Sequence, residues 1–172
     1  MNTASDARSP TVHLIDDDEA VRDSLALLIG TVGLRVVAWA DPRAFLAGFE
    51  RDGIGAIVLD VRMPGISGLG VLDTLVAQGV DQPVIMLTGH GTVDMCRRAF
   101  KAGAAEFLEK PVDDEALIEA LQQAVRQHVQ LRQRAQTDRA ARERWQQLSP
   151  REREVLALIV EGLSNKAIAR AL

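Results

Sequence analysis

Short runs of aliphatic residues alternate with longer amphipathic stretches from residue 12 onward. Each run has four or five residues and is bounded by glycine, proline or charge, which suits strands buried on both faces of a parallel sheet. The stretches between them carry apolar residues at helical spacing, as at Val21, Leu25 and Leu28. The predicted strands are 12–15, 34–38, 56–59, 83–87 and 105–108. Alternating strands and helices predict an α/β fold with a doubly wound, five-stranded parallel sheet of the flavodoxin-like type.

The fifth predicted helix begins near Asp113 and has no evident end, because residues 115–147 contain neither glycine nor proline. We therefore expect one long helix to leave the α/β domain. Its apolar positions form a weak heptad seam, which leaves two interpretations open: a solvated linker helix or a short dimerising coiled coil. The seam positions are Leu117, Leu121, Ala124, His128, Leu131 and Ala135.

A new helical pattern starts after Leu148. Ser149 is placed to cap a helix, Pro150 occupies its first position, and Glu152 completes a capping box. An apolar face follows, and Gly162 and Ser164 separate this helix from a second one that ends the chain with Leu172. The pattern predicts the beginning of a helical hairpin.

The composition is that of a globular protein, with 47% hydrophobic and 26% charged residues. No apolar run approaches the roughly 18 residues that a bilayer span needs, and the amino terminus does not resemble a secretory signal. A single cysteine excludes an internal disulfide framework. We therefore expect a cytoplasmic protein without a membrane partner.

Charge is distributed unevenly along the chain. Residues 1–121 carry a net charge of −9, whereas residues 122–147 carry six arginines against two acidic residues. Residues 148–172 are close to neutral, at +1. Because an acidic body repels nucleic acid, any contact with DNA is expected in the carboxy-terminal part.

Acidic residues gather where the first and third predicted strands end. Asp16 and Asp17 directly follow the first strand, and Asp60 directly follows the third. In the flavodoxin-like strand order these strands are neighbours, so their carboxylates converge on one crevice. Carboxylates this close repel one another unless a proton or a cation intervenes, and Mg²⁺ suits oxygen ligands. Asp18 and Glu19 are interpreted instead as the start of the following helix.

Two further polar residues follow the fourth and fifth strands at the same edge. Thr88 comes directly after the fourth strand and Lys110 after the fifth. A carboxylate nucleophile for phosphoryl transfer needs a cation and hydrogen-bond donors around the transferred group. Asp60 can attack while Mg²⁺, Lys110 and Thr88 hold the phosphoryl oxygens. The set predicts a phosphoacceptor site.

With these residues in place, the chain resembles the CheY-like receiver domain of two-component response regulators. The resemblance spans residues 12–125. It depends on Leu-Ile-Asp16-Asp17-Asp18 with Arg22, Leu-Asp60-Val-Arg-Met-Pro64-Gly-Ile-Ser-Gly68, Leu-Thr88-Gly-His-Gly91, and Lys110-Pro111.

The receiver resemblance implies a chemistry and a partner. Asp60 would accept phosphate from a sensor histidine kinase. Asp17, Asp60 and the Arg62 carbonyl would ligate Mg²⁺, with Asp16 in the metal's acidic pocket. Thr88 and Phe107 would form a switch pair, and the bond before Pro111 would be cis. Phosphorylation would favour a homodimer through the surface of the fourth helix, fifth strand and fifth helix.

The segment Leu148-Ser-Pro-Arg-Glu-Arg-Glu-Val-Leu156, with Glu161-Gly-Leu-Ser-Asn165-Lys166-Ala-Ile-Ala, resembles the start of a LuxR-type helix-turn-helix. Receiver and effector together resemble the FixJ/NarL class. That class has its recognition helix beyond residue 172, so DNA is expected as a partner of the full-length parent and not of this chain alone. The expected division is an amino-terminal tail (1–10), a receiver domain (11–125), a helical linker (126–147) and an incomplete DNA-binding domain (148–172).

The sequence leaves two alternatives to a transcriptional regulator. One is a receiver without an output, acting through protein contacts alone. The other is a metal-dependent phosphatase of the haloacid-dehalogenase type, which places a second aspartate two residues after the nucleophile, where this chain has Arg62. We therefore expect a phosphoacceptor regulator rather than an enzyme, with only self-phosphorylation from small donors and self-dephosphorylation.

Overall fold

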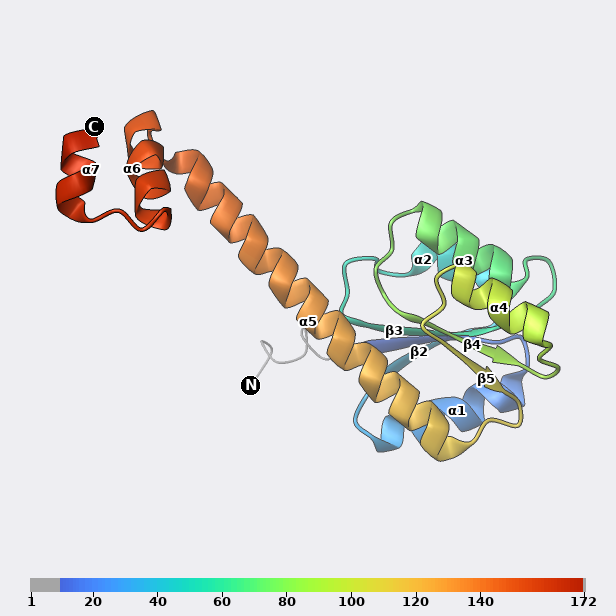
Figure 1. Cartoon of the computed structure of the whole chain (residues 1–172). Helices are drawn as coiled ribbons and strands as arrows, with labels where there is room; N and C mark the ends of the chain where they lie inside the picture. Colours follow the sequence, from blue (N-terminus) through green and yellow to red (C-terminus); the bar gives the residue numbers. More distant parts are fainter. Residues whose placement is uncertain (1–9, 172) are drawn as a thin grey trace. The chain divides into compact units, whose positions relative to one another are not determined.

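Five strands form one parallel sheet in the order β2-β1-β3-β4-β5, as predicted (Figure 1). The computed structural model describes residues 10–171. The expected tail therefore lies outside the described residues except for Pro10, and so does Leu172. Strand β1 pairs in parallel with both β2 and β3. The strands are β1 (Thr11–Ile15), β2 (Arg35–Trp39), β3 (Gly55–Asp60), β4 (Val84–Thr88) and β5 (Glu106–Glu109).

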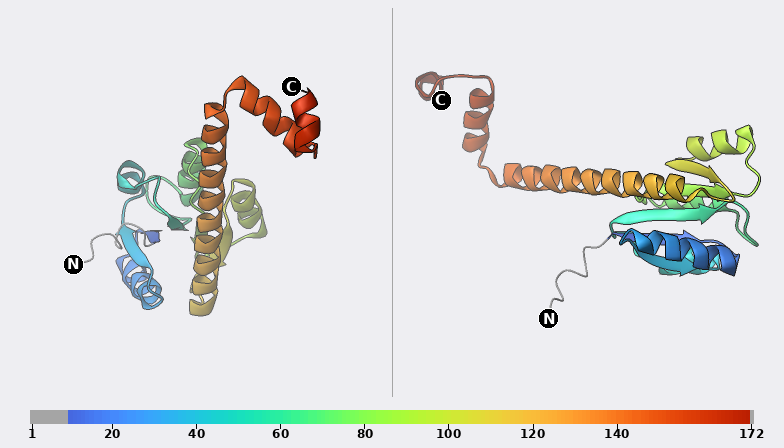
Figure 2. Two further views of the ribbon diagram at one scale, coloured as in Figure 1. Left: turned by 90° about the vertical axis from the view of Figure 1, so that its left-hand side faces the viewer. Right: turned by 90° about the horizontal axis from the view of Figure 1, so that it is seen from below.

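Helices cover both faces of the sheet, so the central strands are buried on both sides (Figures 1 and 2). Helices α1 (Glu19–Thr31) and the first part of α5 (Asp114–Gln147) cover one face. Helices α2 (Pro42–Gly48), α3 (Gly68–Ala77) and α4 (Val93–Lys101) cover the other. Each face of the sheet has its own hydrophobic cluster, and successive residues of one strand belong to different clusters. Leu14 packs in the cluster with α1 and α5, and Ile15 packs in the cluster with α2, α3 and α4. This explains why the strand sequences are apolar throughout rather than alternating.

Local signals in the sequence mark the helix ends correctly. Asp18 accepts hydrogen bonds from the backbone N–H groups of Ala20 and Val21, so it caps α1 as interpreted. Gly33 and Gly103 adopt φ values of 76° and 103°, the left-handed conformation that a helix end favours.

Helix α5 is one continuous helix of 34 residues, as predicted. The first four positions of the heptad seam are buried within the α/β domain, so they are not available to the dimerising coiled coil that was one of the two interpretations. His128 in particular packs against the start of β3, with Nδ1 3.2 Å from the Gly55 nitrogen and Nε2 3.3 Å from Asp81 Oδ1. Hydrophobic spacing alone could not distinguish burial against a sheet from burial against a second helix. The buried seam residues are Leu117, Leu121, Ala124 and His128.

The chain divides into two compact units, residues 1–130 and 131–172. In the second unit, α6 (Pro150–Val160) begins with the predicted capping box between Ser149 and Glu152. The hydrogen bonds from Ser149 lower the pKa of the Glu152 carboxyl. Helix α7 (Asn165–Ala171) follows, and Ile168 is its buried residue. Among residues 10–171, no helix is both long enough and apolar enough to span a membrane.

Candidate functional site

The carboxyl ends of β1 and β3 bring three aspartates together. Asp16 follows β1, and Asp60 is the last residue of β3, its direct neighbour in the sheet. Carboxylate oxygens of Asp16, Asp17 and Asp60 all lie within 4.8 Å of one another. Asp16 and Asp60 are buried, whereas Asp17 is exposed. The cluster therefore opens to solvent on the Asp17 side.

Lys110 reaches the two buried carboxylates from the loop after β5. Its Nζ lies 2.5 Å from Asp16 Oδ2 and 2.8 Å from Asp60 Oδ1. The Lys110 backbone N–H donates to the Thr88 carbonyl at 2.7 Å, which ties the loop to the end of β4. The peptide bond to Pro111 is cis, as the resemblance implied.

The buried charges shift the proton affinities of both partners. Burial raises the pKa of the Asp60 carboxyl, and the hydrogen bond and charge of Lys110 counteract this only in part. Burial disfavours the charge on Lys110, but the hydrogen bonds that its ammonium donates to Asp16 and Asp60, together with their negative charges, outweigh that effect and raise the pKa of Lys110. Lys110 is thus firmly cationic, and an additional cation or a phosphoryl group would enter a site of excess negative charge.

Backbone groups hold the acidic residues in place. The Arg62 N–H donates to Asp60 Oδ2 at 2.9 Å, and the Asp18 N–H donates to Asp16 Oδ1 at 3.0 Å. Arg22 Nη1 donates to the Asp16 carbonyl at 2.8 Å. The hydrogen bond from Arg22 to the Asp16 carbonyl explains why the motif includes Arg22, a residue to which sequence spacing alone assigned no role.

Gly68 supports the site in a way that was not predicted. A Cβ atom at this position would lie 2.1 Å from the Asp60 carbonyl oxygen, and the Gly68 N–H donates to the Val61 carbonyl at 3.0 Å. The start of α3 can therefore approach the Asp60 backbone only because residue 68 has no side chain. The sequence did carry a signal for this role, because a glycine at the first position of a helix lowers the stability of that helix and therefore needs another reason to be there.

The side chains of Thr88 and Phe107 both lie close to the backbone of Gly91. A Cβ atom at Gly91 would lie 3.1 Å from Thr88 Cγ2 and 3.2 Å from Phe107 Cε1. The side chain of Thr88 is fully buried, and Oγ1 accepts a hydrogen bond from the His90 N–H. Both side chains therefore border the backbone of Gly91.

The three carboxylates satisfy the requirements of a hard divalent cation. They provide oxygen ligands close together, and the exposed Asp17 leaves an approach from solvent. Arg62 lies beside them on the chain segment that follows β3. The donor set fits an ion such as Mg²⁺ better than a metal that prefers nitrogen or sulfur ligands.

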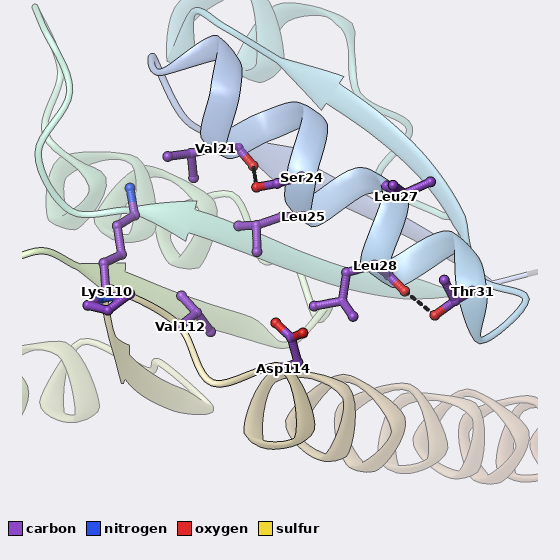
Figure 3. A pocket seen from close by; sticks show the side chains of 10 residues that line it. Val21, Ser24, Leu25, Leu27, Leu28, Thr31, Lys110, Val112 and Asp114 are labelled. Carbon is purple, nitrogen blue, oxygen red and sulfur yellow. Dashed lines mark hydrogen bonds between the residues drawn. The ribbon is translucent and has the colours of Figure 1, made fainter.

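An apolar cavity of about 530 Å³ adjoins the site. It lies between α1 and residues 110–114, and Figure 3 shows Lys110 at its border and Leu25 and Leu28 of α1 along its wall. Leu27, on the same helix, is 75% exposed. An apolar surface beside this charged cluster is suited to contact with another protein.

Two protein families match the chain, each over a different part of it. The response regulator receiver domain matches residues 12–122, and the bacterial regulatory proteins of the luxR family match residues 146–172. The first match alone covers more than half of the chain.

Individual relatives align over nearly the whole chain. The transcriptional regulatory protein FixJ of Azorhizobium caulinodans is 48% identical over 159 residues, covering 92% of this chain and 75% of that protein. The C4-dicarboxylate transport transcriptional regulatory protein DctR of Rhodobacter capsulatus is 42% identical, covering 94% and 83%. The solved structure of the response regulator StyR superposes with a TM-score of 0.85 at 37% identity, covering 95% of this chain and 82% of that one.

Proposed function

The chain belongs to the two-component response regulators that join a receiver domain to a LuxR-type helix-turn-helix, and on that basis we propose that Asp60 is its phosphoacceptor. The observation that carries the proposal is the convergence of three carboxylates with Lys110 at the end of β3. The family membership supports a transcriptional regulator over a receiver without an output.

Each residue of the site has a distinct part in the proposed transfer. An Asp60 carboxylate oxygen forms a bond to phosphorus as the bond between phosphorus and the histidine nitrogen of the sensor kinase breaks. Lys110 neutralises charge on the transferred group, and the Thr88 hydroxyl donates to one of its oxygens. Asp16, Asp17, Asp60 and the Arg62 carbonyl would hold Mg²⁺, which when bound offsets the charge of carboxylates and phosphoryl oxygens.

The sensor kinase is the proposed partner at the apolar cavity beside Lys110. A protein donor must bring its phosphohistidine to Asp60 while it contacts a neighbouring surface. Helix α1 supplies that surface through Leu27 and the cavity wall. Because a small donor such as acetyl phosphate needs no such contact, self-phosphorylation is proposed to be independent of this surface.

Phosphorylation is proposed to act through the Thr88–Phe107 pair. It adds about −1.5 to −2 charge and three acceptor oxygens, toward which Thr88 can move while Phe107 fills the space it leaves. The surface of α4, β5 and α5 then changes and favours a homodimer. The exposed apolar residues Val93 and Phe100 on α4 support this choice of surface.

The proposed division into domains keeps the receiver at 11–125, the linker at 126–147 and the LuxR-type segment at 148–172, with DNA as the partner of the full-length parent protein. The protein is proposed to act in the cytoplasm, where kinases of this class present their phosphohistidine. Pairing two LuxR-type segments in a dimer would let two half-sites on DNA share the binding energy.

Labelling with acetyl phosphate and Mg²⁺ tests the assignment. The wild-type protein should gain one acyl phosphate by intact-mass spectrometry, and Asp60→Asn should gain none. Asp52→Asn, which changes an exposed aspartate near the other end of β3, is the matched control and should be labelled normally. Equal labelling of Asp60→Asn at the native site would refute the assignment.

A further inference from the structure

The second half of α5, residues 131–147, is an exposed and charged helix that the aspartate cluster does not involve. It belongs to the second compact unit of the chain, together with α6 and α7. It carries five arginines against Asp138 and Glu143, whereas residues 1–121 carry a net charge of −9. Positive charge is therefore concentrated on this part of the helix.

Three of these arginines lie on one side of the helix. Successive helical residues turn by about 100°, so Arg134, Arg139 and Arg142 fall within a sector of about 140°. All three are exposed, and together they are called the basic face. The same sector contains the large apolar side chains of Leu131 and Trp145, which are 51% and 46% exposed. The basic face is thus an open surface.

Acidic side chains of the chain itself neutralise the basic face only weakly. Arg139 Nε lies 3.0 Å from Glu143 Oε1, but both side chains are highly exposed, and an exposed pair of this kind adds little stability. In the described part of the chain, neither Arg134 nor Arg142 forms a salt bridge. An external anion can therefore bind all three guanidinium groups, whose planar shape matches a phosphate group.

A second copy of the same helix does not fit the basic face. If residues 131–145 continued the heptad seam in a parallel dimer, Asp138 would meet Asp138 of the second copy, and Arg142 would meet Arg142. Arg134 of one helix and Arg139 of the other would face each other at the flanks of the seam. Like charges would thus meet at three successive contacts, which disfavours a coiled coil and favours a polyanionic partner.

The basic face ends next to the LuxR-type segment. Arg153 of α6 donates through Nη2 to the Gln146 carbonyl at 3.1 Å, which ties the start of α6 to the end of α5. Gln146 follows Arg142 by four residues, or about 6 Å along the helix axis. The luxR family matches residues 146–172, so the basic face directly adjoins the part of the chain for which DNA is the proposed partner.

We infer that the basic face binds phosphate groups of double-stranded DNA beside the site that a complete LuxR-type domain would read. The inference rests on DNA as the proposed partner, but not on Asp60. Arg134 and Arg142 are about 12 Å apart along the helix axis, and a duplex carries one phosphate charge per about 1.7 Å, so each arginine has a phosphate within reach. Phosphate contacts carry no sequence information, so this chain can make them without a recognition helix.

The salt dependence of DNA binding by the full chain tests the basic face. The protein is titrated into a fluorescein-labelled duplex of random sequence and followed by fluorescence anisotropy. At about 50 mM NaCl the wild type should bind with a dissociation constant of about 100 μM or tighter. The combined variant Arg134→Gln, Arg139→Gln and Arg142→Gln should bind at least about tenfold more weakly, and its plot of log K against log salt should be shallower by about 2–3. Glutamine preserves the helix, since its helix propensity is close to that of arginine.

A matched control removes the same charge from the receiver domain. Arg35→Gln, Arg43→Gln and Arg51→Gln together change three exposed arginines and should leave the affinity and the salt slope close to the wild-type values. Asp60→Asn should also bind DNA as the wild type does, which separates the basic face from the phosphoacceptor.

Four results would overturn the inference. The first is no saturable binding by the wild type, and the second is an equal loss in the linker and receiver variants, which would reflect net charge alone. The third is a loss in Lys166→Gln with Arg170→Gln, two exposed changes on α7, but not in the linker variant. That result would place DNA on the LuxR-type segment alone and leave the proposed function intact. The fourth is unchanged DNA affinity of the linker variant with an altered sedimentation coefficient, which would assign the basic face to a second copy of the chain.

Discussion

Lys110→Met removes the cation between two buried carboxylates while keeping a side chain of similar length. Lys110 Nζ lies 2.5 Å from Asp16 and 2.8 Å from Asp60, and the lysine side chain is 20% exposed. The partner side chains are 1% and 6% exposed, so neither can turn to bulk water without moving the backbone. The substitution should therefore leave two like charges facing each other in a buried site.

The loss of stability expected for Lys110→Met follows from Coulomb's law and from the free-energy cost of an unpaired buried charge. At an effective dielectric constant of about 20, opposite charges 2.8 Å apart attract by about 6 kcal/mol, most of which offsets their desolvation. Removing one partner of a buried pair destabilises proteins by about 3–5 kcal/mol. Because Lys110 is partly exposed and a carboxylate can take up a proton, we expect a loss of about 3 kcal/mol in the free energy of unfolding.

Urea unfolding followed through Trp39 fluorescence, in a Trp145→Phe background, measures this loss in the receiver domain. With EDTA the variant should lose about 3 kcal/mol. With Mg²⁺ the loss should shrink, because a ligand that binds only the folded state stabilises it and replaces the missing positive charge. Lys101→Met, at an exposed position on α4, should change stability by less than about 0.5 kcal/mol. A loss below about 0.5 kcal/mol for Lys110→Met, or one that Mg²⁺ does not reduce, would refute the reasoning.

Three further predictions concern other parts of the receiver domain. Gly68→Ala should destabilise it by about 3 kcal/mol or more in thermal unfolding, because a Cβ would lie 2.1 Å from the Asp60 carbonyl oxygen; Gly70→Ala, with contacts no closer than 3.4 Å, is the control. Leu27→Asp should slow phosphotransfer from a kinase and leave labelling by acetyl phosphate unchanged, and equal slowing of both would argue against a docking role for α1. Because burial lowers the pKa of His13 in the folded protein, the imidazole of the unfolded chain binds a proton at a higher pH than that of the folded chain. Stability should therefore fall as pH drops below about 6.5, by at most about 1.4 kcal/mol per pH unit, and His13→Gln should reduce that slope in urea titrations between about pH 7 and pH 5.

The strand–helix order and the aspartate cluster were predictable from the sequence because both depend on local signals. Buried parallel strands are apolar throughout, helices carry their own caps, and in an open parallel sheet the residues after neighbouring strands must converge. Asp16, Asp60 and Lys110 could therefore be brought together by counting strand ends, and the structure shows both carboxylates in contact with Lys110.

Other features depend on contacts between distant segments, and only the tertiary structure decides them. His128 looked like a flaw in a helical seam, yet it packs against Gly55, 73 residues earlier in the chain. The Gln82 side chain donates to the carbonyls of Glu50 and Gly53, which lie 32 and 29 residues earlier in the chain, in a segment that shares no motif with it. Periodicity reports which face of an element is buried, but not what covers it. The sequence by itself therefore determined the order of elements and the strand-end chemistry, whereas packing between segments remote in the chain decided what the buried face of α5 contacts and which groups Gln82 binds.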